Sequence, residues 1–175
     1  MNKPRPKSSR AKESAALAIA KTLAVLLLVL GATNAPAQMP NPYGAPITLE
    51  NAKKAAAAAL AEARKNNWTM AAAITDTAGY LVYFEKIDGT QTGSTFVAVD
   101  KARSAALYKR PTKVFQDAVA AGGEGLRFLR LEGTVPIEGG FPIVMDGKVV
   151  GAIGVSGGTS AQDGQCAKPG ADALK

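Results

Sequence analysis

Apolar and polar positions along the chain predict four helices. The helical signals fall on residues 51–66, 95–108, 112–121 and 160–174. The first of these segments is rich in Ala, Lys and Glu, which are strong helix formers. In the second, apolar residues recur at spacings of three and four positions, which is typical of a helix with one buried face. The members of this apolar stripe are Phe96, Val99, Ala102 and Ala106.

Strand signals come in two pairs. Residues 68–76 and 80–84 are mainly apolar and flank a short turn that contains a glycine. Residues 141–145 and 148–155 flank Asp146-Gly147, a pair that tolerates the positive φ angles of a tight hairpin turn. Because the strands pair as hairpins and the helices lie elsewhere in the chain, we predict an α+β domain of layered α/β type, in which helices cover an antiparallel sheet.

The last predicted helix carries conflicting signals. Ser160 and Asp163 are spaced as a capping residue and the acid of the first helical turn. Lys168-Pro169-Gly170 places a proline inside the segment, where it removes a backbone hydrogen bond. We therefore expect this helix to be shortened or kinked.

The N-terminal region has the three parts of a secretory signal peptide. Residues 1–21 are basic and polar, residues 22–32 form an unbroken apolar or small run, and Ala35 and Ala37 fit a small-residue cleavage site. The apolar run is about half of the ~20 residues that a membrane-spanning helix needs. We predict a signal peptide over residues 1–37, no stable membrane anchor after its removal, and a periplasmic or secreted product.

The remainder divides into a short arm and one domain. Residues 38–46 contain three prolines and a glycine, which indicates an extended N-terminal arm. Residues 47–175 form the predicted domain. The net charge of +7 is concentrated in residues 1–37, which carry +5, so the rest carries +2. With aromatic residues at 6%, neither a basic face nor a stacking platform for nucleic acid is indicated.

The side-chain inventory excludes several kinds of site. The chain has no histidine and a single cysteine, Cys166. This removes the commonest general base and haem ligand, and it excludes zinc and iron–sulfur sites built from Cys and His. No arrangement of a nucleophile with a base is recognisable, and the glycines at 139–140, 151, 154 and 157–158 match neither a dinucleotide-binding fingerprint nor a P-loop. We interpret these glycines as structural.

Several short motifs occur in a fixed order along the chain. They are Leu49-Glu50-Asn51-Ala52, Asp76-x-x-Gly79, Lys101-Ala102-Arg103-Ser104-Ala105, Arg110-Pro111-Thr112 and the block PIEGGFPIVMDGKVVGAIGVSGGTSAQDGQCA at 136–167. Together these motifs resemble the GlcG/HbpS family, which is related to the C-terminal domain of PduO-type corrinoid adenosyltransferases. The resemblance covers residues 47–174 and implies a profilin-like fold with a five-stranded antiparallel sheet flanked by helices. It also implies assembly into dimers or larger rings, and haem binding in secreted members.

The predicted helix 95–108 holds the first candidate ligand-binding residues. Lys101, Ser104 and Tyr108 share one helix face, and Arg103 lies on a neighbouring face. With Arg110, which follows the helix, they could hold carboxylates such as haem propionates. The resemblance places Ser104 where haem-binding relatives carry a threonine near the iron. The alternative is that Lys101 and Arg103 are solvated or paired with Asp100 or Asp117.

Glu138, beside two glycines, is a further candidate that could serve a pocket or remain a surface charge. Haem binding, if present, would be non-covalent, because no haem attachment motif occurs. The sequence does not decide which side chain would be the ligand of the haem iron, and several are candidates. These are Tyr43, Tyr80, Tyr83, Tyr108, Met70, Met145, Cys166 and Ser104.

Three functions remain open. The first is an exported ligand-binding protein that takes up haem or a related tetrapyrrole. The second is an enzyme or accessory factor for a small organic acid, in which Arg103 or Arg110 clamps the carboxylate and Glu138 or Tyr108 moves a proton. The third is a structural homo-oligomeric interaction protein.

Overall fold

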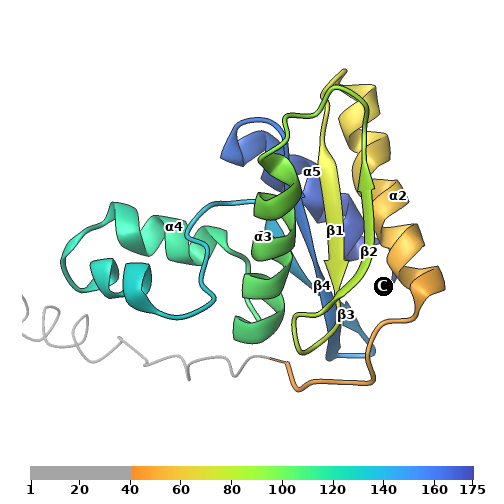
Figure 1. Cartoon of the computed structure of the whole chain (residues 1–175). Helices are drawn as coiled ribbons and strands as arrows, with labels where there is room; N and C mark the ends of the chain where they lie inside the picture. The colour runs from red at the N-terminus through yellow and green to blue at the C-terminus, as the bar shows by residue number, and fades with distance from the viewer. Residues whose placement is uncertain (1–40) are drawn as a thin grey trace, which may run out of the picture. The chain divides into compact units, whose positions relative to one another are not determined.

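The computed structural model describes residues 41–175, and the predicted signal peptide lies outside them (Figure 1). Four antiparallel strands form one sheet in the order β2-β1-β4-β3. They are β1 (Ala71–Thr75), β2 (Leu81–Lys86), β3 (Gly140–Met145) and β4 (Lys148–Ser156). Both predicted hairpins are confirmed, since β1 pairs with β2 and β3 pairs with β4.

Helices cover both faces of this sheet and confirm the α+β architecture. Helices α2 (Leu49–Lys65) and α5 (Ser160–Asp172) pack on one face, and α3 (Ser94–Tyr108) packs on the other (Figure 1). Helix α4 (Lys113–Ala120) and the 3₁₀ segment η1 (Gly123–Arg130) project beside α3. None of the helices within residues 41–175 is long and apolar enough to cross a membrane.

Helix α3 lies unusually close to the sheet because small residues meet at the contact. A Cβ atom built on Gly154 of β4 would lie 2.1 Å from the carbonyl oxygen of Ala98 and 2.5 Å from the backbone nitrogen of Ala102. Ala98 and Ala102 are fully buried there against Ala71 and Ala73 of β1. Glycine and alanine are therefore required at this contact, since any larger side chain would separate the two layers.

This close approach corrects the prediction for one member of the apolar stripe, whereas Ala102 and Ala106 are buried as predicted. Phe96 was expected on its buried stripe, but its side chain is 70% exposed. The space between α3 and the sheet admits alanine and excludes a phenyl ring, so the ring is directed outward.

The opposite face of the sheet holds the larger core. Alanines of α2 pack with Leu60, Ile74 and Ile153, and Cys166 of α5 is buried among them. The proline in α5 does not end the helix, which continues to Asp172. A Cβ atom on Gly170 would lie 2.7 Å from the carbonyl oxygen of Ala55, so α5 and α2 also make a close contact. The helix is thus not ended by Pro169, and the turn after this proline is packed against α2.

The start of α5 differs from the prediction by one residue. Thr159, not Ser160, caps the helix, and Gln162 completes a capping box with it. Asp163 is therefore free of a capping role for its own helix.

The sheet has four strands in the described residues rather than the five implied by the family resemblance. Tyr43 in the arm forms a single parallel bridge to Val149 of β4, and the amide of Gly44 donates to the Val149 carbonyl at 2.8 Å. Pro42 and Pro46 flank this bridge, and neither has an N–H group that could extend a ladder. The Tyr43 hydroxyl donates to the carbonyl oxygens of Ala106 and Leu107 near the end of α3.

The close contact of α3 with the sheet gives a stability prediction. Gly154→Ala should lower the free energy of unfolding by about 1–3 kcal/mol or more, because the methyl group meets backbone atoms of α3 that cannot move aside cheaply. Chemical denaturation measures the change. Gly93→Ala is the matched control, since a Cβ atom there meets no atom within 4 Å. Equal stability of the two variants would contradict the close packing.

Candidate functional site

Lys101 forms a buried ion pair with Asp163. Its Nζ lies 2.7 Å from Oδ2 of Asp163 in α5, and it also donates to the carbonyl oxygen of Val155 at 3.1 Å. The two side chains are 0% and 4% exposed. The backbone amide of Gly158 donates to the other carboxylate oxygen at 3.0 Å. The pair joins helices from opposite faces of the sheet past the end of β4.

Burial shifts the pKa values of both partners. Desolvation lowers the pKa of Lys101, although the hydrogen bond and the charge of Asp163 act in the opposite direction. Desolvation likewise raises the pKa of Asp163 against the effect of Lys101. The charged pair is stable because each member supplies the partner that the other needs away from water.

The two glycines after Glu138 make room for this pair. A Cβ atom on Gly139 would lie 2.9 Å from Nζ of Lys101, and one on Gly140 would lie 2.5 Å from the Lys101 carbonyl oxygen. Glu138 is half-buried, and its negative charge acts on Lys101. These contacts support the structural interpretation of Gly139 and Gly140.

A cleft opens around Arg103. Its volume is about 480 Å³, and it lies between the second half of α3, the β1–β2 turn and the loop that follows η1. Arg103 is exposed, and its guanidinium forms no ion pair with another residue in 41–175. We call this the Arg103 cleft. It is lined by Ala78, Tyr80, Arg103, Leu107, Tyr108, Glu132 and Gly133.

The β1–β2 turn forms one wall of the Arg103 cleft. Oδ1 of Asp76 accepts hydrogen bonds from the backbone amides of Ala78 and Tyr80, both at 2.9 Å. Gly79 has a φ angle of +82°, and a Cβ atom there would lie 2.9 Å from Cγ of Arg103. The arginine stem therefore runs across a glycine that leaves space for it. The ring of Tyr80 is 68% exposed beside it.

The opposite wall is held by Tyr108 and Ser104. The Tyr108 hydroxyl donates to the carbonyl oxygen of Glu132, and its ring packs edge-on against Phe115 at 5.4 Å between centroids. Ser104 is buried, and its hydroxyl accepts from the amide of Val135 at 3.1 Å. Both side chains fix the loop that closes the cleft.

The structure divides the residues predicted for one ligand site. Arg103 and Tyr108 line the cleft together, and Ser104 lies buried behind it. Lys101 is in the interior with Asp163, a partner that helix spacing does not indicate. Arg110 is exposed outside the cleft lining, where its Nε donates to the Tyr108 carbonyl oxygen at 3.1 Å. Of the helix face that Lys101, Ser104 and Tyr108 share, the side chains of Lys101 and Ser104 are buried, and Tyr108 reaches the cleft lining.

Glu138 also lies away from the Arg103 cleft. Its backbone amide donates to Oε1 of Gln116 at 2.8 Å, and its side chain lies against Gly164 of α5. The structure therefore does not bring Glu138 together with Arg103. The sequence indicates Tyr80 only as a possible haem ligand, and the Asp76-x-x-Gly79 turn is the sequence signal for its position in the cleft wall.

The candidate haem ligands are spread across the molecule. Met70 and Cys166 are completely buried, and desolvation raises the pKa of the Cys166 thiol to about 11. Tyr80 and Tyr108 are the candidates that line the cleft with Arg103. No group of three or more His, Cys, Asp or Glu side chains within residues 41–175 is placed to hold a metal ion.

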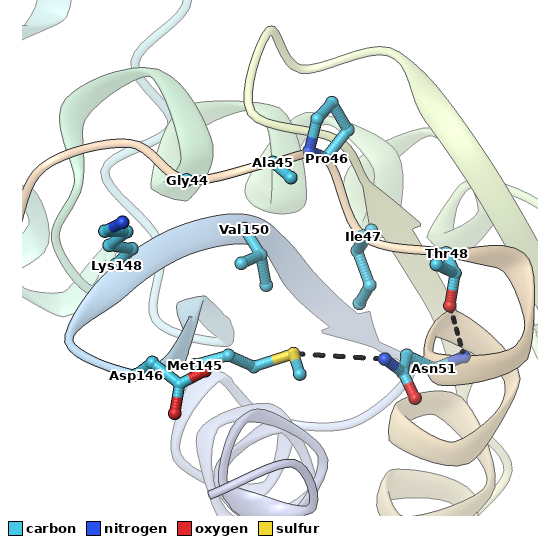
Figure 2. Close-up of a pocket in the computed structure, with 10 residues that line it drawn as sticks. All are labelled: Gly44, Ala45, Pro46, Ile47, Thr48, Asn51, Met145, Asp146, Lys148 and Val150. Atoms are coloured by element: carbon cyan, nitrogen blue, oxygen red, sulfur yellow. Dashed lines mark hydrogen bonds between the residues drawn. The ribbon is translucent and has the colours of Figure 1, made fainter.

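A second hollow lies between the arm, the start of α2 and the β3–β4 turn (Figure 2). Its volume is about 290 Å³. Met145 crosses it, and the Met145 sulfur accepts from the Asn51 side-chain amide at 3.9 Å. Apart from Met145, this hollow contains none of the residues predicted for ligand binding, so the Arg103 cleft is the better candidate.

Comparison with known proteins agrees with this fold. Residues 47–172 match the family model described as "Haem degrading protein HbpS-like". The chain belongs to the HbpS-like family. Protein GlcG of Escherichia coli K12 is 38% identical over 100 residues, which are 57% of this chain and 73% of GlcG. This match agrees with the family resemblance expected from the sequence motifs.

Solved structures of relatives superpose over most of the described residues. The crystal structure of HbpS has a TM-score of 0.69 and 31% identity, and the match covers 75% of this chain and 92% of HbpS. A PduOC:heme complex has a TM-score of 0.66 and 23% identity, and the match covers 74% of this chain and 96% of PduOC. The second likeness establishes the shared fold.

The buried ion pair gives a second prediction. Lys101→Met should lower the free energy of unfolding by about 3–5 kcal/mol, because it leaves the Asp163 carboxyl buried without its partner. Lys113→Met is the matched control, since Lys113 forms an exposed pair with Asp117 within one helix and should change stability by less than about 0.5 kcal/mol. Urea denaturation of both variants makes the comparison. A loss in Lys101→Met no larger than in the control would refute the structural role.

Proposed function

We propose that this protein is an exported ligand-binding module that holds haem or a related flat, acidic tetrapyrrole non-covalently in the Arg103 cleft. The observation that carries the proposal is the exposed guanidinium of Arg103, which lies in a hollow without an ion-pair partner among residues 41–175. A guanidinium presents N–H groups in a planar fork that matches a carboxylate. Membership of a family described as haem-degrading and the structural likeness to a PduOC:heme complex support haem as the ligand class.

The residues present fit such a ligand in three respects. Arg103 provides a positive charge for a propionate, and Tyr80 and Leu107 provide exposed apolar surface for a flat ring, with Leu107 40% exposed. The cleft volume of about 480 Å³ lies in the range of small-molecule sites. Of the two tyrosines in the cleft lining, Tyr80 would be the candidate iron ligand, because the Tyr108 hydroxyl already donates to the carbonyl oxygen of Glu132.

Bound haem would supply light absorption and redox chemistry, while the residues of this chain would bind and orient it. Arg103 fixes the carboxylate end. The Asp76 turn holds the Tyr80 wall through its two amide hydrogen bonds, and Tyr108 holds the opposite loop.

The enzyme alternative has less support. It needs a carboxylate clamp and a proton-transferring group around one substrate. Glu138 lies outside the Arg103 cleft, and the Tyr108 hydroxyl is engaged with a backbone carbonyl. A thermal-shift screen against small carboxylic acids tests this alternative, because a ligand specific to the folded state raises the melting temperature.

Haemin titration of the purified protein, followed at the Soret band, tests the proposal. Arg103→Ala should weaken binding about tenfold or more, because it removes a charge-assisted contact. Arg110→Ala is the matched control and should change affinity less than about twofold, since Arg110 lies outside the cleft lining. A titration without saturation in the wild type, or equal affinity of both variants, would contradict the proposal that haem binds in this cleft.

The acidic rim gives a prediction of opposite sign. Glu132→Gln removes a negative charge from the exposed edge of the cleft while keeping the shape of the side chain. Haemin affinity should therefore rise by about two- to threefold at low salt, and the gain should shrink as salt screens the charge. A weaker or unchanged affinity would show that the acidic groups of the ligand do not approach this edge.

A further inference from the structure

The segment that holds α4 and η1 carries the positive charge excess of the described domain. Residues 109–131 contain five basic and two acidic residues, a net charge of +3, whereas the rest of residues 41–175 has ten basic and eleven acidic residues, a net charge of −1. We call residues 109–131 the α4–η1 lobe. Helix α4 and η1 pack mainly against each other and project beside α3 (Figure 1). The positive charge is therefore concentrated on a part of the domain that projects from its core.

The 3₁₀ segment η1 has three rows of side chains. Its period of three residues per turn places residues i and i+3 directly above one another. One row, formed by Gly125 and Phe128, packs on α4. A Cβ atom on Gly125 would lie 1.8 Å from the carbonyl oxygen of Ala118, and the centroid of the Phe128 ring lies 5.2 Å from that of Phe115. This contact fixes η1 on α4, so the other two rows are held in position.

The two remaining rows are exposed and differ in character. Leu126 and Leu129 form an apolar row, and they are 50% and 59% exposed. Arg127 and Arg130 form a basic row beside it, and both are exposed. Arg127 lies 3.5 Å from the Glu124 carboxylate in an exposed pair, and Arg130 forms no ion pair within residues 41–175. Apolar and positive surface thus lie side by side on one projecting segment.

The basic row borders a hollow with a volume of about 380 Å³. Phe128 and Leu131 line this hollow together with Arg127 and Arg130. A guanidinium binds phosphate oxygens through its planar fork of N–H groups, and the apolar side chains favour hydrocarbon. This combination suits a phosphate that is joined to hydrocarbon, as it is in a phospholipid.

We propose that the α4–η1 lobe docks reversibly on an anionic phospholipid surface. Leu126 and Leu129 enter the upper part of the acyl layer, and Arg127 and Arg130 remain at the level of the phosphates. An apolar row with arginines along its side is the arrangement by which amphipathic segments bind in the plane of a membrane interface. Charge complementarity selects this occupant, because an anionic bilayer attracts the lobe and does not attract the rest of the domain, whose net charge is −1.

This contact is separate from the Arg103 cleft. None of the four side chains in the two exposed rows of η1 lines that cleft. The proposal therefore goes beyond ligand binding and does not depend on haem.

Cosedimentation with phospholipid vesicles, without haemin, tests the docking. The predicted mature chain, residues 38–175, contains the described core and is used so that the basic and apolar residues 1–37 do not contribute. It should bind vesicles of phosphatidylglycerol and phosphatidylcholine in equal parts about tenfold or more better than vesicles of phosphatidylcholine alone. Binding should fall as salt screens the charges.

The basic row is tested by the double variant Arg127→Gln/Arg130→Gln. It should weaken binding to the phosphatidylglycerol vesicles about tenfold or more, because each arginine near an anionic surface adds to the attraction. Arg64→Gln/Lys65→Gln is the matched control, since it removes the same charge from two exposed residues of α2 and should weaken binding less than about threefold. Equal losses in the two variants would show that net charge, and not the lobe, determines binding, which would overturn the proposal.

The apolar row is tested at constant charge. Leu126→Ser/Leu129→Ser should weaken vesicle binding about tenfold or more, because less apolar surface leaves the water. Leu49→Ser/Leu81→Ser removes leucines that are 52% and 51% exposed elsewhere in the domain, and it should leave binding unchanged. All of the altered side chains are exposed, and urea denaturation checks that each variant is folded.

Two results with the wild type would also overturn the proposal. One is equal binding to both kinds of vesicle, and the other is binding to neither, which is expected if an acidic protein is the partner of the lobe. Haemin titration of the two lobe variants should match the wild type, since the Arg103 cleft is intact in both. A failure of membrane docking and a failure of haem binding are therefore distinguishable.

Discussion

The closeness of α3 to the sheet determines most of what this molecule presents to its surroundings. Gly154 lacks the one carbon atom that would push the helix away, and alanines fill the narrow gap. The larger and the charged side chains of the helix cannot fit in this gap, so each is directed either past the end of the sheet or into the solvent. Lys101 reaches inward past the end of β4 to Asp163, and Phe96, Arg103 and Leu107 are directed to the solvent.

The buried pair of Lys101 and Asp163 completes this arrangement. A lysine amine without water needs a negative partner, and Lys101 reaches one across the end of the sheet, on α5. The glycines at 139 and 140 keep that route open. Helices on opposite faces are thereby tied to each other, and the α3 residues that face outward have a fixed support.

Sequence patterns predicted the helices and strands well because each of these elements is determined mainly by residues that are close together in the chain. The turn at Asp146-Gly147 and the alanine-rich helix each follow from a few neighbouring residues. Phe96 was wrongly placed on the buried face of α3 because apolarity was taken as the sign of burial, whereas the narrow gap selects for small side chains. The pairing of Lys101 with Asp163 could not be found in this way, since 62 positions separate them.

Only the residues of the Arg103 cleft that lie on α3 were predicted as a group from the sequence. Helix spacing placed Ser104 and Tyr108 on one face and Arg103 on a neighbouring face, all in the second half of α3. The cleft also needs Tyr80 from a turn and Glu132 from a loop, and their positions follow from long-range packing.

The burial of Cys166 has a practical consequence for spectroscopy. It is the single cysteine of the chain, and its thiol is enclosed within the core beneath α2. A cysteine introduced on the surface would therefore be the preferred attachment point for a thiol-reactive dye or spin label, with the native residue left in place. Distances between copies or between elements become measurable in a protein whose interior is unaltered.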